Sequence, residues 1–312
     1  MNPLVSIVTP SYNQVAYLED TIRSVLEQDY EPIEYVVVDG GSTDGSVEII
    51  ERYADRLAWW TSEPDDGQAQ AINKGFAHTS GEILGYLNSD DTLLPHAVSR
   101  LVAALEADLE LVCAYGDALW LDPSGRTMGH ALAHSWDPVP MLRSGSARLH
   151  QPAALWRRAA WERVGCFEES LHYTFDTLFF LRLATIGPAR HLPEPLAGYR
   201  LHPDSKSTSE PPPKLEEYLR LANEFLAPEQ LPDFLRRHSR AGRGAYHRRA
   251  GLGYYNAGDF GRARRLFLRS LVLSPRMSRK SAKHFARAML PGPLVRARRA
   301  FRERRQARST AV

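Results

Sequence analysis

The amino-acid sequence predicts an α/β fold with a mostly parallel central sheet and helices on both faces of that sheet. Short apolar runs alternate with amphipathic segments through the first half of the chain, as repeated β-α-β units do. The run IEYVVVD at 33–39 is apolar almost throughout, which indicates a strand covered on both faces. Polar segments follow several of these runs, where loops at the carboxyl ends of parallel strands are expected.

The first half of the chain supplies most of the predicted sheet. Residues 17–28 are predicted to be helical because Leu18, Ile22 and Val25 recur on one helical face. The other helices are expected around 47–53, 68–78 and 95–107. The expected strands are 4–9, 33–39, 57–61, 82–87 and 111–117.

The second half has a less regular pattern. The turn DPSGR at 122–126 predicts a hairpin, a short helix is expected near 159–164, and a more apolar helix begins near Asp176. The segment HPDSKSTSEPPPK at 202–214 predicts a loop and a domain boundary. Residues 245–275 resemble a single tetratricopeptide-type helical hairpin. Because one copy cannot build a solenoid, we expect a helical cap or, alternatively, a protein-docking element.

The composition is that of an ordinary globular protein, with 43% hydrophobic and 24% charged residues. No stretch reaches the roughly 18 consecutive apolar residues that span a bilayer. The start, MNPLVSIVTPSYNQ, lacks the basic region and apolar core of a signal peptide. Cys113 and Cys166 are the only cysteines, which excludes a disulfide framework and a cysteine-based zinc site. We therefore expect a cytoplasmic protein.

The C-terminal segment 276–312 differs from the rest of the chain in charge. It carries twelve Lys or Arg and one Glu, a net charge of +11, which leaves −9 on residues 1–275 out of a total of +2. A disordered tail and an amphipathic surface helix that binds anionic lipid at the inner face of the cell membrane are both compatible with this pattern. Nucleic-acid binding is disfavoured because no fold motif for it accompanies the charge.

Four polar loops are predicted to meet at one edge of the sheet because each follows a strand. Singly, each has a structural explanation: Asp39 or Asp44 as a helix cap, Asp65 and Asp66 as a helix N-terminal pair, and NSDD as the end of a strand before a helix near Pro95. Together they indicate a ligand site. No G-x-G-x-x-G or Walker pattern is present, which argues against a dinucleotide dehydrogenase and a P-loop enzyme. The four loops are TPSYN (9–13), DGGSTDGS (39–46), SEPDDGQ (62–68) and NSDD (88–91).

The motifs resemble a known family. SIVTPSYNQVAYLEDTIRSVLEQDYEPIEYVVVDGGSTDGS and SEPDDGQAQAINKGFAHTSGEILGYLNSDD, in this order, are similar to the nucleotide-binding half of the family 2 glycosyltransferases, which have the GT-A fold. The resemblance covers residues 4–205 and implies a GT-A domain at 1–210, with a nucleotide-binding half at 1–117 and an acceptor and catalytic half at 118–210. A helical extension at 211–275 and the basic tail at 276–312 would follow.

The resemblance implies a nucleotide site in the first loops. Thr9, Pro10, Tyr12 and Asp39 would hold the base, and a carboxylate at position 39 suggests a uridine or thymidine nucleotide because it can accept the imide N–H. Asp65 resembles the third-loop aspartate of the family, which lies near the nucleotide. The donor is therefore expected to be a nucleotide-sugar, with a UDP-sugar as the first choice.

The resemblance also implies a divalent cation, Mg²⁺ or Mn²⁺, that bridges the donor diphosphate. NSDD occupies the place of the family's D-x-D motif, with Asp90 as the principal metal ligand and Asp91 as a ligand or its neighbour. Asn88 stands where many relatives have Asp, and it can still bind a ribose hydroxyl. His202 in YRLHPDSKS is expected to complete the metal shell, and Lys206 to cover the diphosphate.

Asp176 is expected to be the catalytic base. GCFEESLHYTFDTLFFLRLA at 165–184 resembles the family segment that contains this residue, although Leu178 stands where relatives often have a second acid. Inverting transfer needs one carboxylate that takes the proton of the attacking hydroxyl. A plain helix cap is the structural alternative for Asp176. RLHQPAALWRR at 148–158 resembles the acceptor-side segment, so His150 and Gln151 are expected to line the acceptor pocket or to serve the structure.

These features predict a metal-dependent inverting glycosyltransferase that acts on a glycan or lipid-linked acceptor in cell-surface polysaccharide synthesis. Two alternatives stay open: a catalytically inactive nucleotide-sugar-binding scaffold, and a nucleotidyltransferase on a similar sheet. The sugar, the acceptor and the oligomeric state are not indicated by the sequence.

Overall fold

A computed structural model of the chain describes residues 2–203, 205–206, 211–275 and 286. It divides into two compact units, one of Met1–Met141 with Ser146–Ser209 and one of Leu142–Gly145 with Glu210–Val312. The basic tail at 276–312 lies outside the described residues apart from 286, so its predicted membrane contact stays a prediction. Among the helices that are described, none is both long enough and apolar enough to cross a membrane.

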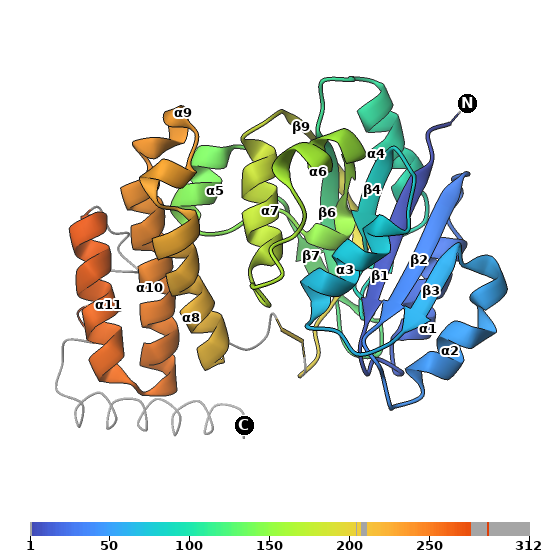
Figure 1. The fold of residues 1–312 in the computed structure, drawn as a ribbon, viewed down its shortest axis with the longest axis horizontal. Helices are drawn as coiled ribbons and strands as arrows, with labels where there is room; N and C mark the ends of the chain where they lie inside the picture. Colours follow the sequence, from blue (N-terminus) through green and yellow to red (C-terminus); the bar gives the residue numbers. More distant parts are fainter. Residues whose placement is uncertain (1, 204, 207–210, 276–285, 287–312) are drawn as a thin grey trace. The chain divides into compact units, whose positions relative to one another are not determined.

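The first half of the chain forms the predicted parallel part of the sheet (Figure 1). β1 lies between β2 and β4, with β3 at the edge, and all three pairings are parallel. The strands are β1 (Val5–Ser11), β2 (Ile33–Asp39), β3 (Trp59–Ser62) and β4 (Ile83–Tyr86), and the helices are α1 (Leu18–Leu26), α2 (Ser46–Arg52), α3 (Gln68–Ala77) and α4 (Ala97–Glu106). A 3₁₀ turn at Ala54–Arg56 precedes β3.

Helices cover both faces of this sheet, as predicted. Alternate residues of a strand face opposite sides, so Val5 and Ile7 pack in the core shared with α1, α2 and α4. Val8 faces α3 instead: a Cβ atom on Gly75 of α3 would meet the side chain of Val8 and would lie 3.3 Å from Val38 Cγ2. The continuous apolar runs in β1 and β2 therefore reflect burial on both faces.

The second half adds antiparallel pairings that sequence periodicity does not predict. β8 (Ala154–Arg157) lies antiparallel between β4 and β6 (Cys113–Leu121), and β9 (Ala189–Arg200) runs parallel to β6. β7 (Thr127–Ala131) forms the predicted hairpin with β6, and the two-residue β5 (Thr92–Leu93) pairs with β9. β9 contains Pro193 and Pro195, which are depleted in strands because proline cannot donate a ladder hydrogen bond.

An aromatic core fixes the helix that carries Asp176. α7 (Phe175–Ala184) packs Phe179 against Trp156 of β8 and Phe167, with ring centroids 5.2 Å and 4.5 Å apart. Tyr86 at the end of β4 makes an edge contact with Phe167 at 5.5 Å. α5 (Pro138–Ser144), a 3₁₀ turn at Gln151–Ala153 and α6 (Arg158–Val164) complete this part of the chain. The first turn of α7 is thus held near the end of β4.

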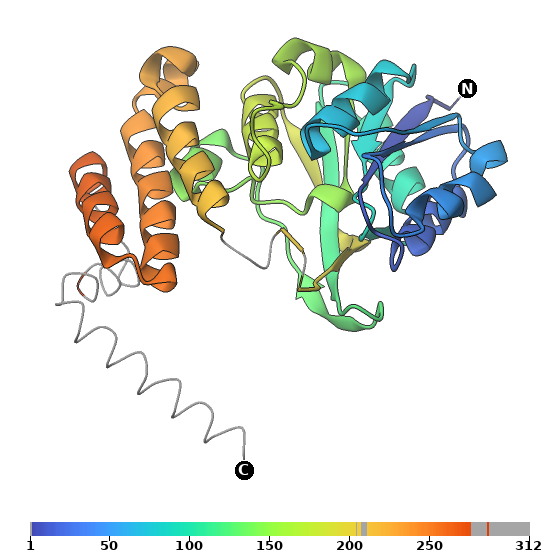
Figure 2. The ribbon, with the colours of Figure 1, turned by 60° about the horizontal axis from the view of Figure 1, so that its bottom comes forward.

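The second unit is helical (Figure 2). Its elements are α8 (Pro212–Arg220), a π-helical turn (Leu221–Phe225), a 3₁₀ turn (Pro228–Gln230), α9 (Asp233–Arg236), α10 (Ser239–Ala257) and α11 (Phe260–Leu273). α10 and α11 form the predicted hairpin, which turns at Gly258 with φ 88°. Asp259 caps α11 by accepting a hydrogen bond from the Arg262 N–H at 3.0 Å. Ala263 and Phe267 of α11 are buried.

Gly81, directly before β4, lies in close contact with the backbone that leads into β1. A Cβ atom there would meet Ser6 Oγ and would lie 2.7 Å from the carbonyl oxygen of Leu4. We expect Gly81→Ala to lower the free energy of unfolding by about 1–3 kcal/mol because the backbone must move to admit the methyl group. All six tryptophans lie in the first unit, so urea unfolding followed by tryptophan fluorescence measures the loss there.

Gly129 in β7 is the matched control because a Cβ atom there would meet nothing within 4 Å. Gly129→Ala should leave the unfolding curve unchanged or slightly stabilised. Equal stability of the two variants would contradict the packing described for β1 and β4.

Candidate functional site

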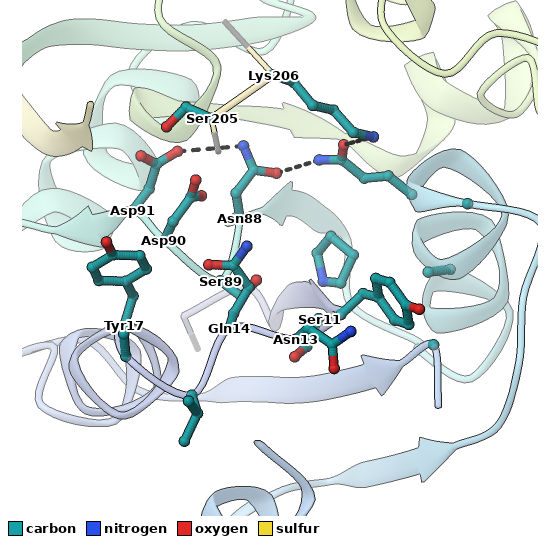
Figure 3. Close-up of a pocket in the computed structure, with 18 of the residues that line it drawn as sticks. Ser11, Asn13, Gln14, Tyr17, Asn88, Ser89, Asp90, Asp91, Ser205 and Lys206 are labelled. Atoms are coloured by element: carbon teal, nitrogen blue, oxygen red, sulfur yellow. Dashed lines mark hydrogen bonds between the residues drawn. The ribbon is translucent and has the colours of Figure 1, made fainter. Parts of the chain in front are cut away.

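A pocket of about 1030 Å³ opens at the carboxyl ends of the parallel strands, where the predicted loops meet (Figure 3). Its wall comes from the four predicted loops and from the segment after β9. The lining residues are 10–17, Gly40, Asp44, 64–68, Ala71, 88–91, Tyr199, Arg200, His202, Ser205 and Lys206. The predicted residues that line this pocket are Pro10, Tyr12, Asp65, Asn88, Asp90, Asp91, His202 and Lys206.

The first loop is held by hydrogen bonds to the second. The Asn13 N–H donates to Ser42 Oγ at 2.8 Å, and Asn13 Oδ1 accepts from the Thr43 N–H at 2.9 Å. Asp44 accepts from the Val15 N–H at 2.9 Å; although burial acts to raise the pKa of Asp44, this bond and those from Ser46 lower it overall. The loop is thus fixed while Tyr12 stays 62% exposed at the pocket.

Two residues predicted to hold the base lie beneath the pocket wall. Asp39 is fully buried, and its carboxylate accepts hydrogen bonds from Gly41 N, Ser42 N, Ser42 Oγ and Ser62 Oγ at 2.5–3.1 Å. Thr9 Oγ1 is hydrogen-bonded to the hydroxyl of Tyr35 at 2.9 Å. In the described structure these groups hold the loop after β2 and the core under β1.

Ser11, the last residue of β1, differs from Asp39 and Thr9 in its side-chain hydrogen bonding. It lines the pocket and is 4% exposed, yet its Oγ has no hydrogen-bond partner among the described residues. A buried hydroxyl without a partner costs about 1–3 kcal/mol of folding free energy. Sequence reasoning missed this residue because nothing in TPSYN distinguishes it from an ordinary loop serine.

The turn after β4 presents one carboxylate to the pocket and buries the other. Asp90 Oδ2 lies 3.0 Å from His202 Nε2, and the ring of His202 lies 4.8 Å from that of Tyr17. Asp91 is 2% exposed and accepts from the Arg200 N–H at 2.9 Å and from Asn88 Nδ2 at 3.3 Å. Burial, and then the charge of Asp90, raise the pKa of Asp91 well above its ordinary value.

Arg200 holds this turn in place, and the sequence offered only the YR-x-H pattern as a signal for it. Its guanidinium is 3% exposed, and Nε donates to the Asp90 carbonyl oxygen at 2.9 Å. Its other nitrogens bond the Pro123 carbonyl oxygen at 3.1 Å and Asp20 Oδ2 at 3.2 Å. The guanidinium also lies over the ring of Tyr17, 4.9 Å from its centroid. One buried cation thus connects three segments around the pocket.

A chain of side-chain hydrogen bonds crosses the same wall. Lys206 Nζ donates to Gln68 Oε1 at 3.1 Å, and Gln68 Nε2 donates to Asn88 Oδ1 at 2.5 Å. Asn88 Nδ2 donates in turn to Asp91 and, at 3.5 Å, to Gln151 Oε1, whose own Nε2 donates to the Tyr86 carbonyl oxygen. Figure 3 draws the links from Lys206 through Gln68 and Asn88 to Asp91.

The direction of this chain is fixed by Lys206. An ammonium group can only donate hydrogen bonds. The amides of Gln68 and Asn88 must therefore point their oxygens toward Lys206 and their nitrogens toward Asp91. An ionised aspartate at position 88 could not donate to Asp91 and would add a third carboxylate to the turn.

The donors at the turn fit a divalent cation that also binds a ligand. The Asp90 carboxylate and the His202 imidazole are hydrogen-bonded at 3.0 Å, and both are group types that bind divalent cations. Within the described ranges, no three His, Cys, Asp or Glu side chains gather closely enough to hold a metal ion on their own. Asp90 and His202 are therefore two side chains that could contribute ligands to a divalent cation at this turn.

The remaining predicted residues lie near the pocket but outside its lining set. Asp176 is half-buried in the first turn of α7, and its charge, after burial, helps to raise the pKa of Tyr86. His150 is also half-buried and makes an edge contact with Trp120 at 5.4 Å; burial lowers its pKa. Gln151 is 7% exposed and belongs to the hydrogen-bond chain.

Solved structures with the same fold bind nucleotide-sugars. The S. aureus TarS structure matches over 95% of this chain and 52% of its own, with a TM-score of 0.63 at 18% identity. The mannosyltransferase PcManGT from Pyrobaculum calidifontis, solved in complex with GDP-Man and Mn²⁺, matches over 92% and 79% of the two chains, with a TM-score of 0.56 at 20% identity. At these identities the likeness establishes the fold, which is that of the GT-A glycosyltransferases.

Sequence relatives define the family. The model for glycosyl transferase family 2 matches residues 6–119. An uncharacterized glycosyltransferase of Mycobacterium tuberculosis is 32% identical over 190 residues, which cover 59% of this chain and 70% of the relative. The chondroitin synthase of Escherichia coli is 28% identical over 227 residues, 72% of this chain but only 33% of the relative. The chain belongs to glycosyl transferase family 2.

Gln68→Glu tests the direction of the hydrogen-bond chain. A glutamate can accept from Lys206 but cannot donate to Asn88 Oδ1, so Asn88 must turn its oxygen toward Asp91. We expect the free energy of unfolding to fall by about 1–3 kcal/mol in urea titrations followed by tryptophan fluorescence.

Gln70→Glu, on the same helix, is the control because the Gln70 side chain bonds only the exposed Asp66 among the contacts described. Its effect should stay within about 0.5 kcal/mol. If the two variants lose equal stability, the chain of bonds does not determine the orientation of Asn88.

Proposed function

We propose that the pocket binds a nucleotide-diphosphate sugar and that the protein transfers this sugar, with inversion at its anomeric carbon, to a hydroxyl group of an acceptor. The observation that carries the proposal is the pairing of Asp90 Oδ2 and His202 Nε2 at 3.0 Å on the pocket wall, with Lys206 on the same wall and the exposed ring of Tyr12 in the first loop. This set offers ligands for a cation, a positive charge for phosphates and an aromatic surface for a base.

The nucleoside would bind in the first loops. Tyr12 offers a flat apolar face beside Pro10, and Asp65 Oδ2 faces Gly40 on the pocket wall. A uracil base is our first choice because S. aureus TarS residues 1–349, a structure with the same fold at a TM-score of 0.59, is in complex with UDP-GlcNAc. GDP-Man in PcManGT makes guanine the second choice.

Asp90 and His202 would hold Mg²⁺ or Mn²⁺ against the diphosphate, and Mn²⁺ accompanies GDP-Man in PcManGT. The cation would neutralise the charge that develops on the leaving diphosphate. Lys206 adds a second positive charge from the protein, and Asn88 presents its amide between Gln68 and Asp91. Asp91 accepts a hydrogen bond from the Arg200 N–H, which fixes the turn to the end of β9, and its pKa is raised.

Asp176 would act as the base. Its carboxylate takes the proton of the acceptor hydroxyl as the oxygen attacks the anomeric carbon; the carbon–oxygen bond to the diphosphate breaks with its electron pair on the phosphate oxygen. Asp176 lies in the first turn of α7, which the aromatic core around Phe167 and Phe179 holds rigidly beside β4. A rigid support of this kind keeps a base at a fixed distance from a bound donor.

The acceptor would be a glycan or a lipid-linked saccharide in polysaccharide synthesis. The chondroitin synthase of E. coli and the hyaluronan synthase of Pasteurella multocida are relatives at 28% identity, and their names support a saccharide acceptor. This chain spans 33% and 21% of their lengths, so their complete activities are not carried over. Gln151 and His150, next to the turn and near Trp120, are the proposed acceptor-side residues.

Asp176→Asn tests the proposed reaction. Release of UDP from UDP-GlcNAc with water as acceptor should fall by about 10²- to 10⁴-fold in kcat because the amide cannot take the proton. The affinity for UDP, measured by calorimetry, should stay unchanged because Asp176 lies outside the pocket wall.

Asp55→Asn, at an exposed carboxylate in the turn before β3, is the control and should keep wild-type turnover. Turnover of Asp176→Asn near the wild-type level would exclude Asp176 as the base.

A further inference from the structure

Two buried serines of β1 have opposite hydrogen-bonding states. Ser6 is fully buried; its Oγ donates to Glu34 Oε2 at 2.6 Å and accepts from the Gly81 N–H at 2.9 Å. Ser11 is 4% exposed, and its Oγ has no partner among the described residues. Both serines lie in β1, so their difference in hydrogen bonding does not arise from one being in a strand and the other in a loop. A buried hydroxyl that has no hydrogen-bond partner in the folded protein is available to bond a ligand.

The position of Ser11 limits what that partner is. Its carbonyl oxygen accepts from the Gly40 N–H at 2.8 Å, and a Cβ atom on Gly40 would lie 2.9 Å from Asp65 Oδ2. Ser11 also directly precedes Tyr12, whose ring is exposed, and all four residues line the pocket. Asp90 and His202, the proposed phosphate-side ligands, belong to other segments of the wall, and Figure 3 draws Ser11 beside Asn13 rather than beside Asp91.

We propose that Ser11 is a nucleotide-binding residue whose hydroxyl forms a hydrogen bond with the nucleoside part of the donor, at a base or ribose oxygen or N–H group. This inference rests on the proposed function. A serine hydroxyl can donate and accept, and turning it toward the pocket needs rotation about χ1 alone. The polar side-chain atoms of Thr9 and Asp39, in contrast, already have hydrogen-bond partners in Tyr35, Ser42 and Ser62.

The test is Ser11→Ala, measured for binding and for stability with the full-length protein in Mn²⁺. Calorimetric Kd values for UDP and GDP should rise by about 5- to 30-fold for whichever nucleotide the wild type binds. The Kd for pyrophosphate, which has no nucleoside, should not change. The melting temperature should stay the same or rise by about 2–4 °C because an unbonded hydroxyl has been removed.

Ser6→Ala is the matched control, about 16 Å away along the same strand. It should lower the melting temperature, since it removes the bonds of Ser6 Oγ to Glu34 and to the Gly81 N–H, and it should leave the UDP and GDP affinities unchanged. The proposal is overturned if Ser11→Ala binds nucleotides as the wild type does, weakens pyrophosphate binding equally, or loses stability as Ser6→Ala does. Failure of the wild type to bind either nucleotide overturns the proposed donor pocket itself, and the assignment of Ser11 with it.

Discussion

The geometry of the pocket depends on the hydrogen bonds of the buried Arg200 guanidinium. Arg200 lies at the end of β9, and its bond to the carbonyl oxygen of Asp90 joins residues 110 positions apart in the sequence. A buried charge that loses its partners costs about 3–5 kcal/mol. The turn after β4, the hairpin at Pro123 and the helix α1 at Asp20 are therefore held around one cation, and Asp90 keeps its side chain on the pocket wall.

The charges of the site follow from this arrangement. Asp91 is buried beside Asp90, and the N–H groups of Arg200 and Asn88 are its hydrogen-bond donors. An asparagine at position 88 supplies one of those donors without adding a negative charge. The Ser11 hydroxyl at the pocket has no hydrogen-bond partner among the described residues. Sites that bind ligands commonly keep such groups at some cost in stability.

Much of the first half could be predicted from the sequence because local periodicity determines it. Predicted strands at 4–9 and 33–39 correspond to Val5–Ser11 and Ile33–Asp39, since burial on both faces makes them continuously apolar. β8 and β9 could not be predicted because long-range pairing, and not local pattern, makes them strands. The predicted loops line the pocket, but the hydrogen bonds of single side chains could not be predicted: Asp39 accepts bonds from its own loop, whereas Ser11 Oγ has no partner among the described residues.

We propose that Asp90 and His202 bind a cation together with a nucleoside diphosphate. Titration of UDP and GDP into the wild-type protein by calorimetry, first in Mn²⁺ and then in excess EDTA, measures this binding. We expect the nucleotide affinity of the wild type to be at least about tenfold lower in EDTA than in Mn²⁺, a difference of ~1.4 kcal/mol. The affinity of an Asp90→Asn variant in Mn²⁺ should equal that of the wild type in EDTA. Equal affinities of the wild type in Mn²⁺ and EDTA, or no binding in either, would contradict the account.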